Sequence, residues 1–544
     1  MPSLLSQLTE RVQAAAGIDP EMRPATKPQF GHFQSNVALR LAKTEGRPPR
    51  GVAAALVERL DVSDLCEPVE VAGPGFLNFR IRASVLARAA SDLLADPHVG
   101  IEQVTEPHTV VIDYSAPNVA KQLHVGHLRS TIIGDCFRRV LTARGDQVIA
   151  QSHIGDWGRQ FGMLVEQVLD EGLDLSGLDL AGAEDLYLRA NAHLKADANF
   201  ADRARERVVL LQAGDAETRR IWQQLIELSQ TGFDSTYSRM NVLLTAADTA
   251  GESTYNAMLG PLCDDLESRG IAVPDDGALV VFADGFEVPA IMRNSQGGYG
   301  YDSTDVAALK YRVDELKADR ILYVVGAPQT LHFALIFAVA RKAGYLPDRV
   351  QAVHVPFGQV LGADGKKFST REGTAVRLDD LLDGAEEIAT RSVAMAAIKY
   401  ADLSNQLQKD YTFDLERMTA TTGDTGPYLQ YAHARATQIL RRAEAEGLTV
   451  QEVTVLEEPA EQALALLLSR FGEVVAGVAT DLQPHKLCTY LFDLASAMSV
   501  FYERCPVLKA EGEVRASRLA LCATVRRVLA AGLDLLGIEA PDQM

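Results

Sequence analysis

Two histidines stand three residues apart, at His124 and His127, where the sequence predicts the start of a helix. This spacing places both rings on one helix face, beside backbone N–H groups without helical partners and at the positive end of the helix dipole. Such a cluster can bind a triphosphate and oppose the charge that builds on the α-phosphate as pyrophosphate leaves. Gly126 lacks a Cβ atom, so an adenosine could approach the backbone closely. The alternative is a pair of surface histidines that cap a helix.

A second candidate for phosphate binding is the glycine-containing loop GADGKKFSTREG at residues 362–373. Glycines that allow movement, together with cations and a hydroxyl, describe a loop that can close on phosphates and stabilise a transition state. Taken alone, such a run is more often a solvated basic turn. Beside the histidine pair, phosphate binding is the favoured interpretation. The side chains concerned are Lys366, Lys367, Ser369 and Arg371.

The elements around the histidine pair predict a nucleotide-binding sheet. The buried strand TVVIDY (109–114) is followed by a turn that contains Pro117, by a helix that ends at Gly145, and by a second strand, DQVIAQSHIG (146–155). This βαβ order places the histidine loop at the carboxyl end of a strand, where open parallel sheets bind nucleotides. A further buried strand, RILYVVGAP (320–328), precedes another helix. We therefore predict an α/β, Rossmann-type catalytic domain.

The pattern along the chain divides it into three parts. Residues 1–105 predict a small α/β domain, because amphipathic segments flank an alternating, strand-like run that contains Gly-Pro-Gly. Residues 106–404 are the predicted catalytic domain, interrupted at about 160–275 by mostly amphipathic helix, which indicates an insertion. Residues 405–544 have an almost entirely helical pattern and predict a separate all-α domain.

Length, charge and cysteine content constrain the class of protein. The chain has 544 residues, enough for roughly three or four domains. Its net charge of −20 disfavours indiscriminate nucleic-acid binding, so any RNA contact must use local basic or aromatic groups. The six cysteines include no CxxC pair, and we expect neither a structural zinc site nor a disulfide framework. No secretory signal and no apolar run of about 18 residues is evident, so we expect a cytoplasmic protein.

The two phosphate-binding candidates resemble a known pair of motifs. SAPNVAKQLHVGHLRSTIIGD and KKFSTREG are similar to the HIGH and KMSKS motifs of class I aminoacyl-tRNA synthetases, and the full strings resemble the arginyl family. Further matching stretches, spread over nearly the whole chain, are FGHFQSNVALRLAK, GDWGRQFGML, IKYADLSNQLQKDYTFD and TGPYLQYAHAR.

The resemblance implies both an architecture and a reaction. The family has an N-terminal additional domain, a Rossmann catalytic domain with an insertion, and a helical anticodon-binding domain. It activates L-arginine with ATP and Mg²⁺ to arginyl-adenylate and transfers the arginyl group to the 3′-terminal ribose of tRNA(Arg). We also expect a monomer.

One departure from the second motif concerns Thr370, which stands where a second lysine is often found. Family members with this change carry a lysine three residues before the HIGH motif, and this chain has Lys121 at that position. The resemblance therefore implies that Lys121 supplies the missing charge. A flexible surface lysine is the alternative.

An arginine pocket must bind a planar cation with five N–H donors, and carboxylates are its geometric complement. Asp113 ends the first strand and can point into the cleft, or else accept a structural hydrogen bond. Tyr301 and Asp305 are four residues apart and share a face if their segment is helical. Tyr301 could stack on the guanidinium and Asp305 could pair with it. By resemblance these two residues and Gln329 bind arginine; for Asp305 a helix cap is the alternative.

Three more residues near these strands are candidates for the same site. By resemblance, Asn118 holds the α-amino group of arginine, and Ser115 is a neighbouring candidate. His332 is either an ATP contact or merely part of the start of the next helix.

Candidate RNA contacts lie near both ends of the chain. Tyr431 and Arg435, in TGPYLQYAHAR, share a helical face, and unpaired bases are bound by stacking and guanidinium contacts of this kind. The resemblance implies that these two residues and the C-terminal Met544 contact the anticodon; packing between domains is the alternative for Tyr431. Gln34 and Asn36 would reach the tRNA elbow, with core packing as the alternative.

Two other functions fit part of the pattern. Another class I synthetase, or a small-molecule nucleotidyltransferase, would share the ATP-binding fold, but the helical C-terminal domain and the Tyr301/Asp305 pair disfavour it. A synthetase-derived RNA-binding or scaffold protein without catalysis should have lost the phosphate-binding histidines, and both are present. We therefore predict an arginine–tRNA ligase.

Overall fold

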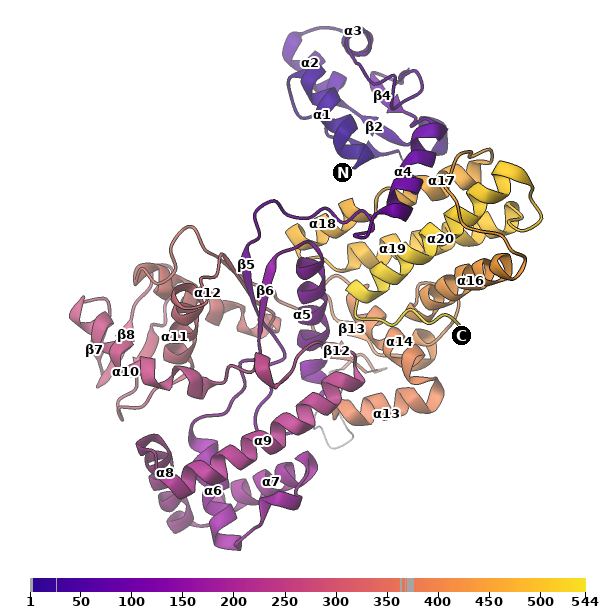
Figure 1. The fold of residues 1–544 in the computed structure, drawn as a ribbon. Coiled ribbons are helices and arrows are strands. Elements are labelled where there is room, and N and C mark those ends of the chain that lie inside the picture. The colour runs from indigo at the N-terminus through magenta and orange to yellow at the C-terminus, as the bar shows by residue number, and fades with distance from the viewer. Residues whose placement is uncertain (1–2, 26, 363, 367, 369–375) are drawn as a thin grey trace.

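The computed structural model describes residues 3–25, 27–362, 364–366, 368 and 376–544. Three parts follow one another along the chain (Figure 1): an N-terminal α/β unit, a central unit built on a parallel sheet, and a C-terminal bundle of helices. The predicted fold class is confirmed.

In the described residues, the N-terminal unit contains the α-helices α1 to α4 and a small antiparallel sheet of order β1-β2-β4-β3. Helix α1 begins where the Ser3 hydroxyl accepts a hydrogen bond of 3.0 Å from the N–H of Ser6. Its buried residues Leu4, Leu8 and Val12 are four apart and form one apolar stripe. The elements are α1 Leu4–Ala16, α2 Val37–Glu45, α3 Pro49–Val57, α4 Ala83–Ala95, β1 Arg23–Pro24, β2 Phe33–Ser35, β3 Glu70–Ala72 and β4 Phe76–Phe79.

The central sheet has the order β11-β10-β5-β6, and its neighbouring strands are parallel. Ile112 belongs to the core shared with α5, and Val111 to the core shared with α11 and α12, so helices cover both faces. Asp113 is aligned with Tyr323, which brings the carboxyl ends of β5 and β10 together. The elements are β5 Thr109–Asp113, α5 Val125–Ala143, β6 Gln147–Gln151, β10 Arg320–Tyr323, α12 Thr330–Lys342 and β11 Gln351–His354.

Between β6 and β10 the chain adds a helical cluster and a second small sheet. The helices of this cluster share an apolar core of their own, at the bottom of Figure 1. The antiparallel sheet β7-β8-β9 was not predicted, because β7 is exposed throughout and Ile291 of β9 faces solvent. The elements are α6 Arg159–Glu171, α7 Leu180–Ala196, α8 Ala198–Ala213, α9 Ala216–Arg239, α10 Glu252–Ser268, β7 Val273–Asp275, β8 Ala278–Val281, β9 Ala290–Arg293 and α11 Tyr301–Asp314.

The C-terminal bundle packs against α5 of the central unit through α18 and α20, and α14 of the central unit packs against both α5 and α16. One stretch, Pro459–Asp481, contains an 18-residue window with a mean hydropathy of 1.5, which by length and composition alone would be enough to cross a membrane. It folds as two helices, α17 and α18, which both pack on α19. The last elements of the central unit are β12 Val360–Leu361, α13 Leu378–Ile388 and α14 Arg391–Leu403. The elements that follow are β13 Tyr411–Thr412, α15 Leu415–Met418, α16 Gly426–Ala445, α17 Pro459–Leu468, α18 Phe471–Asp481, α19 His485–Arg504 and α20 Gly512–Leu535.

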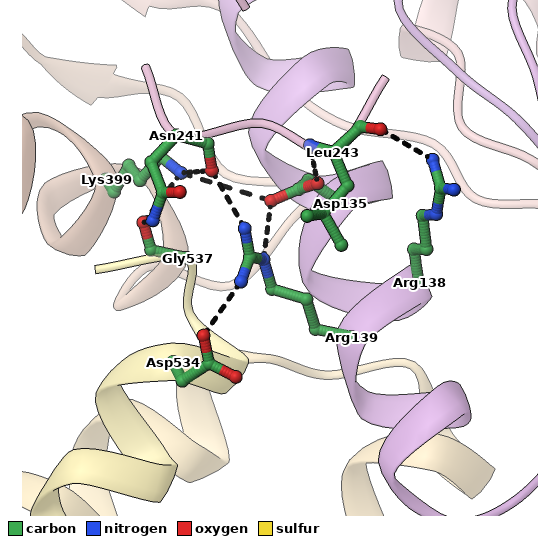
Figure 2. A network of polar contacts seen from close by, with 8 residues as sticks. All are labelled: Asp135, Arg138, Arg139, Asn241, Leu243, Lys399, Asp534 and Gly537. Atoms are coloured by element: carbon green, nitrogen blue, oxygen red, sulfur yellow. Dashed lines mark hydrogen bonds and ion pairs between the residues drawn. The ribbon is translucent and has the colours of Figure 1, made fainter. Parts of the chain in front are cut away.

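A buried polar network joins α5 to the bundle (Figure 2). Asp135 of α5 accepts hydrogen bonds of 2.8 Å from Nε of Arg139 and from the N–H of Leu243. Arg139 also donates to Asp534, near the end of α20, and to the carbonyl oxygen of Asn241, each at 2.9 Å. These contacts fix the second half of α5, whose first turn carries the histidine pair.

Candidate active site and RNA-contact pocket

The histidine pair caps helix α5 reciprocally. The N–H of Gly126 donates to Nδ1 of His124 at 3.0 Å, and the N–H of His124 donates to Nδ1 of His127 at 3.1 Å. The ring centroids lie 4.0 Å apart. Because each Nδ1 accepts a backbone hydrogen, the neutral form of each ring carries its hydrogen on Nε2. The pair therefore adds two side-chain donors to the N–H groups of a helix start, where anions bind.

Burial keeps His127 uncharged. Burial, together with the neighbouring His124, lowers the pKa of His127 to about 3. At neutral pH its ring is therefore a neutral N–H donor. Gly126 makes room for the pair, since a Cβ atom there would lie 2.6 Å from Cε1 of His124. The space that the sequence suggested for adenosine is taken by the histidine ring.

The segment after the second motif lies directly against the histidine loop. The N–H of Val125 donates to the carbonyl oxygen of Val376 at 2.9 Å, and the N–H of Leu378 donates to that of Leu123 at 2.8 Å. These two bonds flank His124 on both sides. The chain that enters α5 and the chain that leaves the second motif are thus joined at the backbone.

Two of the cations expected near phosphates can be placed. Lys366 lies in a turn, where its carbonyl oxygen accepts a hydrogen bond of 2.8 Å from the N–H of Gly362. Nζ of Lys121 lies 4.2 Å from the ring centroid of Tyr187 in α7, which is a cation–π contact. The other residues expected from the second motif, Lys367, Ser369 and Arg371, lie outside the described residues.

The loop after β5 holds Ser115 and Asn118 in a constrained conformation. Ser115 has a φ of 71°, its N–H donates to Oγ of Ser130 at 2.9 Å, and its hydroxyl lies 2.7 Å from that of Tyr237 in α9. A non-glycine residue in this region costs about 1 kcal/mol or more, and such residues cluster at functional sites. Asn118 forms an isolated parallel bridge with Gly155, in the loop after β6.

Asp113 lies at the end of β5, paired with a residue of the chain itself. Its Oδ2 accepts a hydrogen bond of 2.7 Å from Nη2 of Arg312, whose Nε donates to Gln151 at 2.7 Å. Arg312 is completely buried and lies with its guanidinium carbon 5.0 Å from the Tyr323 ring centroid. This geometry favours the alternative in which Asp113 accepts a structural hydrogen bond.

Helix α11 begins at Tyr301 and carries Asp305 one turn further on, so the helical segment assumed for this pair is present. The Tyr301 side chain is 77% exposed. Oδ2 of Asp305 lies 2.6 Å from Nε2 of His332, and its Oδ1 lies 4.0 Å from Nε2 of His153. The hydrogen bond to Asp305 raises the pKa of His332. His332 thus faces the carboxylate, and Gln329 is exposed in the turn before α12.

Glu252, at the start of α10, is a further acidic residue of this region that the sequence did not single out. Burial and the negative charges of Asp156 and Asp305 raise its pKa to about 7. A bound cation stabilises partly buried carboxylates that repel one another, and a guanidinium can form hydrogen-bonded ion pairs with them. An acidic residue in the first turn of a helix is common, so the sequence contained no distinguishing signal.

Tyr431, Arg435 and Met544 line one pocket of about 190 Å³ in the C-terminal bundle. Nη2 of Arg435 donates to the Tyr431 hydroxyl at 2.8 Å, and its guanidinium carbon lies 4.6 Å from the centroid of that ring. The guanidinium carbon also lies 5.2 Å from the ring centroid of Tyr502, a residue of α19 that the sequence did not single out. The C-terminal tail is held here by His433, whose Nδ1 lies 2.9 Å from the carbonyl oxygen of Pro541.

Gln34 and Asn36 lie in the N-terminal unit, on and just after strand β2. Nε2 of Gln34 donates to Oδ1 of Asn78 at 2.8 Å, across the pair of strands β2 and β4. Asn36 precedes helix α2, and its buried Oδ1 has no hydrogen-bond partner among the described residues. Gln34 is thus engaged within the sheet, whereas Asn36 keeps an unused acceptor.

Comparison with known proteins covers all three parts of the chain. Family models match for an arginyl tRNA synthetase N terminal domain at residues 3–81, for the catalytic domain of class I tRNA synthetases (R) at 90–415, and for a DALR anticodon binding domain at 429–544. The chain is 62% identical to the arginine–tRNA ligase of Cutibacterium acnes, with 100% of both chains covered. It is 50% identical to that of Thermobifida fusca, with 99% of each covered.

Solved structures agree with these matches. The arginyl-tRNA synthetase of Plasmodium falciparum superposes with a TM-score of 0.84 at 27% identity over 100% of both chains. That of Thermus thermophilus gives 0.83 at 28% identity, over 99% of this chain and 100% of the other. With its three domains matched and its relatives aligned end to end, the chain belongs to the arginyl-tRNA synthetases.

Proposed function

We propose that His124 and His127 carry the activation step of this ligase. In that step an arginine carboxylate oxygen attacks the α-phosphorus of ATP, the bond from that phosphorus to pyrophosphate breaks, and arginyl-adenylate forms. The reciprocal cap of α5 carries the proposal, because it leaves each ring with an Nε2–H donor beside the helix N–H groups. Donors fixed in this way stabilise the charge that develops as pyrophosphate leaves.

The cations of the two motifs would complete the phosphate site. We assign Lys366, Lys367 and Arg371 to the phosphates, with Ser369 as a hydroxyl donor. Lys121 would replace the charge that Thr370 lacks. Mg²⁺ enters with ATP as part of the substrate and neutralises part of the phosphate charge. Positioning and charge stabilisation carry this step, without a separate general base.

Arginine recognition is assigned to the carboxylates around the start of α11. Asp305 and Glu252 would pair with the guanidinium, and Tyr301 would stack on it. Gln329 lies in the turn after β10 and would contact the same ligand. Because His332 is hydrogen-bonded to Asp305, we place it beside this carboxylate, where its charged form competes with the guanidinium, rather than on ATP.

The loop after β5 would hold the other end of arginine. Ser115 and Asn118 are fixed there by contacts with α5, α9 and the loop after β6, which supports a role at the α-amino group. Asp113 would act indirectly, by pairing with the buried Arg312 at the end of β5, where this loop begins.

The RNA contacts are assigned to two surfaces. In the pocket of Tyr431, Arg435 and Met544, the aromatic rings and the guanidinium would stack on unpaired anticodon bases. Gln34 and Asn36 would contact the tRNA elbow. The terminal ribose of tRNA then accepts the arginyl group, at its 2′-hydroxyl if this chain follows class I.

We further propose that the parts work as three domains in a cytoplasmic monomer. These are residues 1–105 for the tRNA elbow, 106–404 for catalysis with the insertion at about 160–275, and 405–544 for the anticodon. The three family models match the chain in this order, which supports the division.

The decisive experiment is aminoacylation of unfractionated tRNA by the purified chain, run with each of the twenty amino acids. Only arginine should give ATP-dependent charging. The same assay on His124→Ala and His127→Ala tests the phosphate role that the reciprocal histidine cap supports. A variant of either histidine with full activity would remove the phosphate role.

A further inference from the structure

Helix α7 of the insertion touches the chain on both sides of the phosphate site. Oε2 of Glu184 accepts a hydrogen bond of 2.8 Å from Nε2 of Gln122 and lies 3.3 Å from Nη2 of Arg377. Gln122 stands two residues before His124, and Arg377 forms an isolated antiparallel bridge with His124. One carboxylate of α7 therefore connects the residues that lead into the first motif with those that leave the second.

Tyr187 lies three residues after Glu184, on the same face of α7. Nζ of Lys121 stands 4.2 Å from the centroid of its ring, and the electron-rich face of the ring attracts the ammonium. A lysine is a point charge on a flexible four-carbon stem, so its direction is set by its partners. A partner that fixes this direction before the reaction lowers the entropy lost in reaching the transition state.

The loop that carries Lys121 is held by the insertion. Val119 and Ala120, immediately before Lys121, are completely buried in the apolar core of the insertion, together with Leu186 of α7. The N–H of Ala120 donates to Oγ of Ser229 in α9 at 2.9 Å. The insertion therefore determines where Lys121 stands.

We propose that Tyr187 and Glu184 are positioning residues of the activation step. Tyr187 holds the Lys121 ammonium in place for the departing pyrophosphate. Glu184 holds Gln122 and Arg377 at fixed positions beside His124. This inference rests on the proposed charge-stabilising role of Lys121. Both residues act through the loop, not on the reacting atoms. Loss of the Tyr187 ring should therefore lower kcat and leave the KM for arginine unchanged.

The test is a double-mutant cycle in the full-length chain, measured by steady-state aminoacylation. Tyr187→Leu removes the ring face and Tyr187→Phe keeps it, while Leu188→Ala changes a 58% exposed neighbour on the same helix and is the matched control. We expect Tyr187→Leu to lower kcat about five- to tenfold, the rate equivalent of one partly desolvated cation–π contact. Tyr187→Phe and Leu188→Ala should stay within about twofold of the wild type, as for neutral substitutions.

The cycle separates this inference from the role of Lys121 itself. In the Lys121→Ala background, Tyr187→Leu should cost nothing further, because the partner is gone. Equal losses in both backgrounds overturn the inference, and so does a Tyr187→Phe variant as slow as Tyr187→Leu. A fully active Lys121→Ala variant would instead refute the proposed role of Lys121.

Variants of Glu184 test the same inference independently if Tyr187→Leu does not fold. Glu184→Ala changes a partly exposed side chain and should lower kcat about threefold, whereas Glu184→Gln keeps an acceptor for Gln122 and should recover most of the rate. Thermal unfolding of each variant shows whether the fold is intact. A normal kcat for Glu184→Ala, in a folded protein, overturns the inference.

Discussion

The ammonium of Lys399 donates a hydrogen bond of 2.8 Å to the carbonyl oxygen of Gly537, so a completely buried lysine of α14 is joined to the chain just after α20 (Figure 2). The same ammonium donates to the carbonyl oxygen of Asn241 at 3.0 Å and lies 4.0 Å from Asp135. A Cβ atom on Gly537 would lie 2.5 Å from Nζ of Lys399, and its φ is 67°. The lysine thus joins the central unit to the chain just after α20, at a residue whose left-handed φ favours glycine.

Burial lowers the pKa of Lys399 from 10.5 to about 8, which predicts a specific effect of pH on stability. Between those two values the unfolded chain holds a proton that the native chain has lost, so stability rises with pH over this range. Relative to Lys399→Met, the wild type should gain about 2 kcal/mol of unfolding free energy between pH 8 and pH 10. Denaturant titrations of both proteins at the two pH values measure this difference; a constant difference would contradict the prediction.

For His127→Ala we expect turnover to fall about 100- to 1,000-fold, the usual cost of one charge-stabilising donor. Because the pKa of His127 is about 3, its protonation should not affect the rate between pH 5 and pH 8. Steady-state aminoacylation measures the loss. His108→Ala, which removes a 64% exposed histidine outside the site, is the control and should remain active.

Asp305→Ala should raise the KM for arginine by about 30-fold or more, since loss of a buried carboxylate partner of a cation costs about 2–5 kcal/mol. The KM for ATP should stay nearly unchanged. Asp302→Ala removes a carboxylate at the same helix start, 3.5 Å from His332, and is the matched control. Equal effects of the two substitutions on arginine would mean that general negative charge, not the Asp305 contact, matters.

Arg435→Ala should raise the KM for tRNA about tenfold and leave the KM for arginine unchanged, because stacking contacts to a base are worth about 1–3 kcal/mol. Arg417→Ala, which removes an exposed arginine from α15, controls for the loss of positive charge. Aminoacylation over a range of tRNA concentrations separates the two variants. If both weaken tRNA equally, the pocket has no special part in anticodon binding.

The fold could be predicted wherever a long hydrophobic pattern is bounded by turn residues. The strand expected at 109–114 is Thr109–Asp113, and the helix expected to end at Gly145 runs over Val125–Ala143. The sheet β7-β8-β9 escaped prediction because its strands have only three or four residues, too few for a hydrophobic pattern to be distinguished, and β7 is exposed throughout. Its pairing is decided by tertiary contacts.

The relative placement of the candidate site residues could be predicted where they are close in sequence. His124 and His127, like Tyr301 and Asp305, keep a helical spacing that can be read directly. Glu252 could not be found in this way, because its raised pKa comes from burial and from carboxylates far along the chain, which only the folded structure brings about. The same holds for the contact of Asp113 with Arg312, an arginine far along the chain that the sequence did not single out.

The arginine site should strengthen as pH rises from 6 to 8. Glu252, with a pKa of about 7, must lose its proton to pair with a guanidinium. Asp305 raises the pKa of His332, and the charged imidazolium forms an ion pair with Asp305. His332 must therefore lose its proton before Asp305 is free to bind arginine. Both groups therefore reach the form that binds arginine only as pH increases. A single group with a pKa near 7 predicts a fall of about tenfold in the arginine KM over this range.

Two variants assign this pH dependence to its groups. Glu252→Gln keeps the shape of the side chain without its titration, so the arginine KM should be higher than in the wild type and change less with pH. His332→Asn removes the competing cation, so the arginine KM should fall most at pH 6, where the imidazolium holds Asp305. Measurements at saturating ATP and tRNA report the arginine KM without contributions from the other two substrates. A KM that stays flat, or rises, between pH 6 and pH 8 in the wild type would mean that neither proton is coupled to arginine.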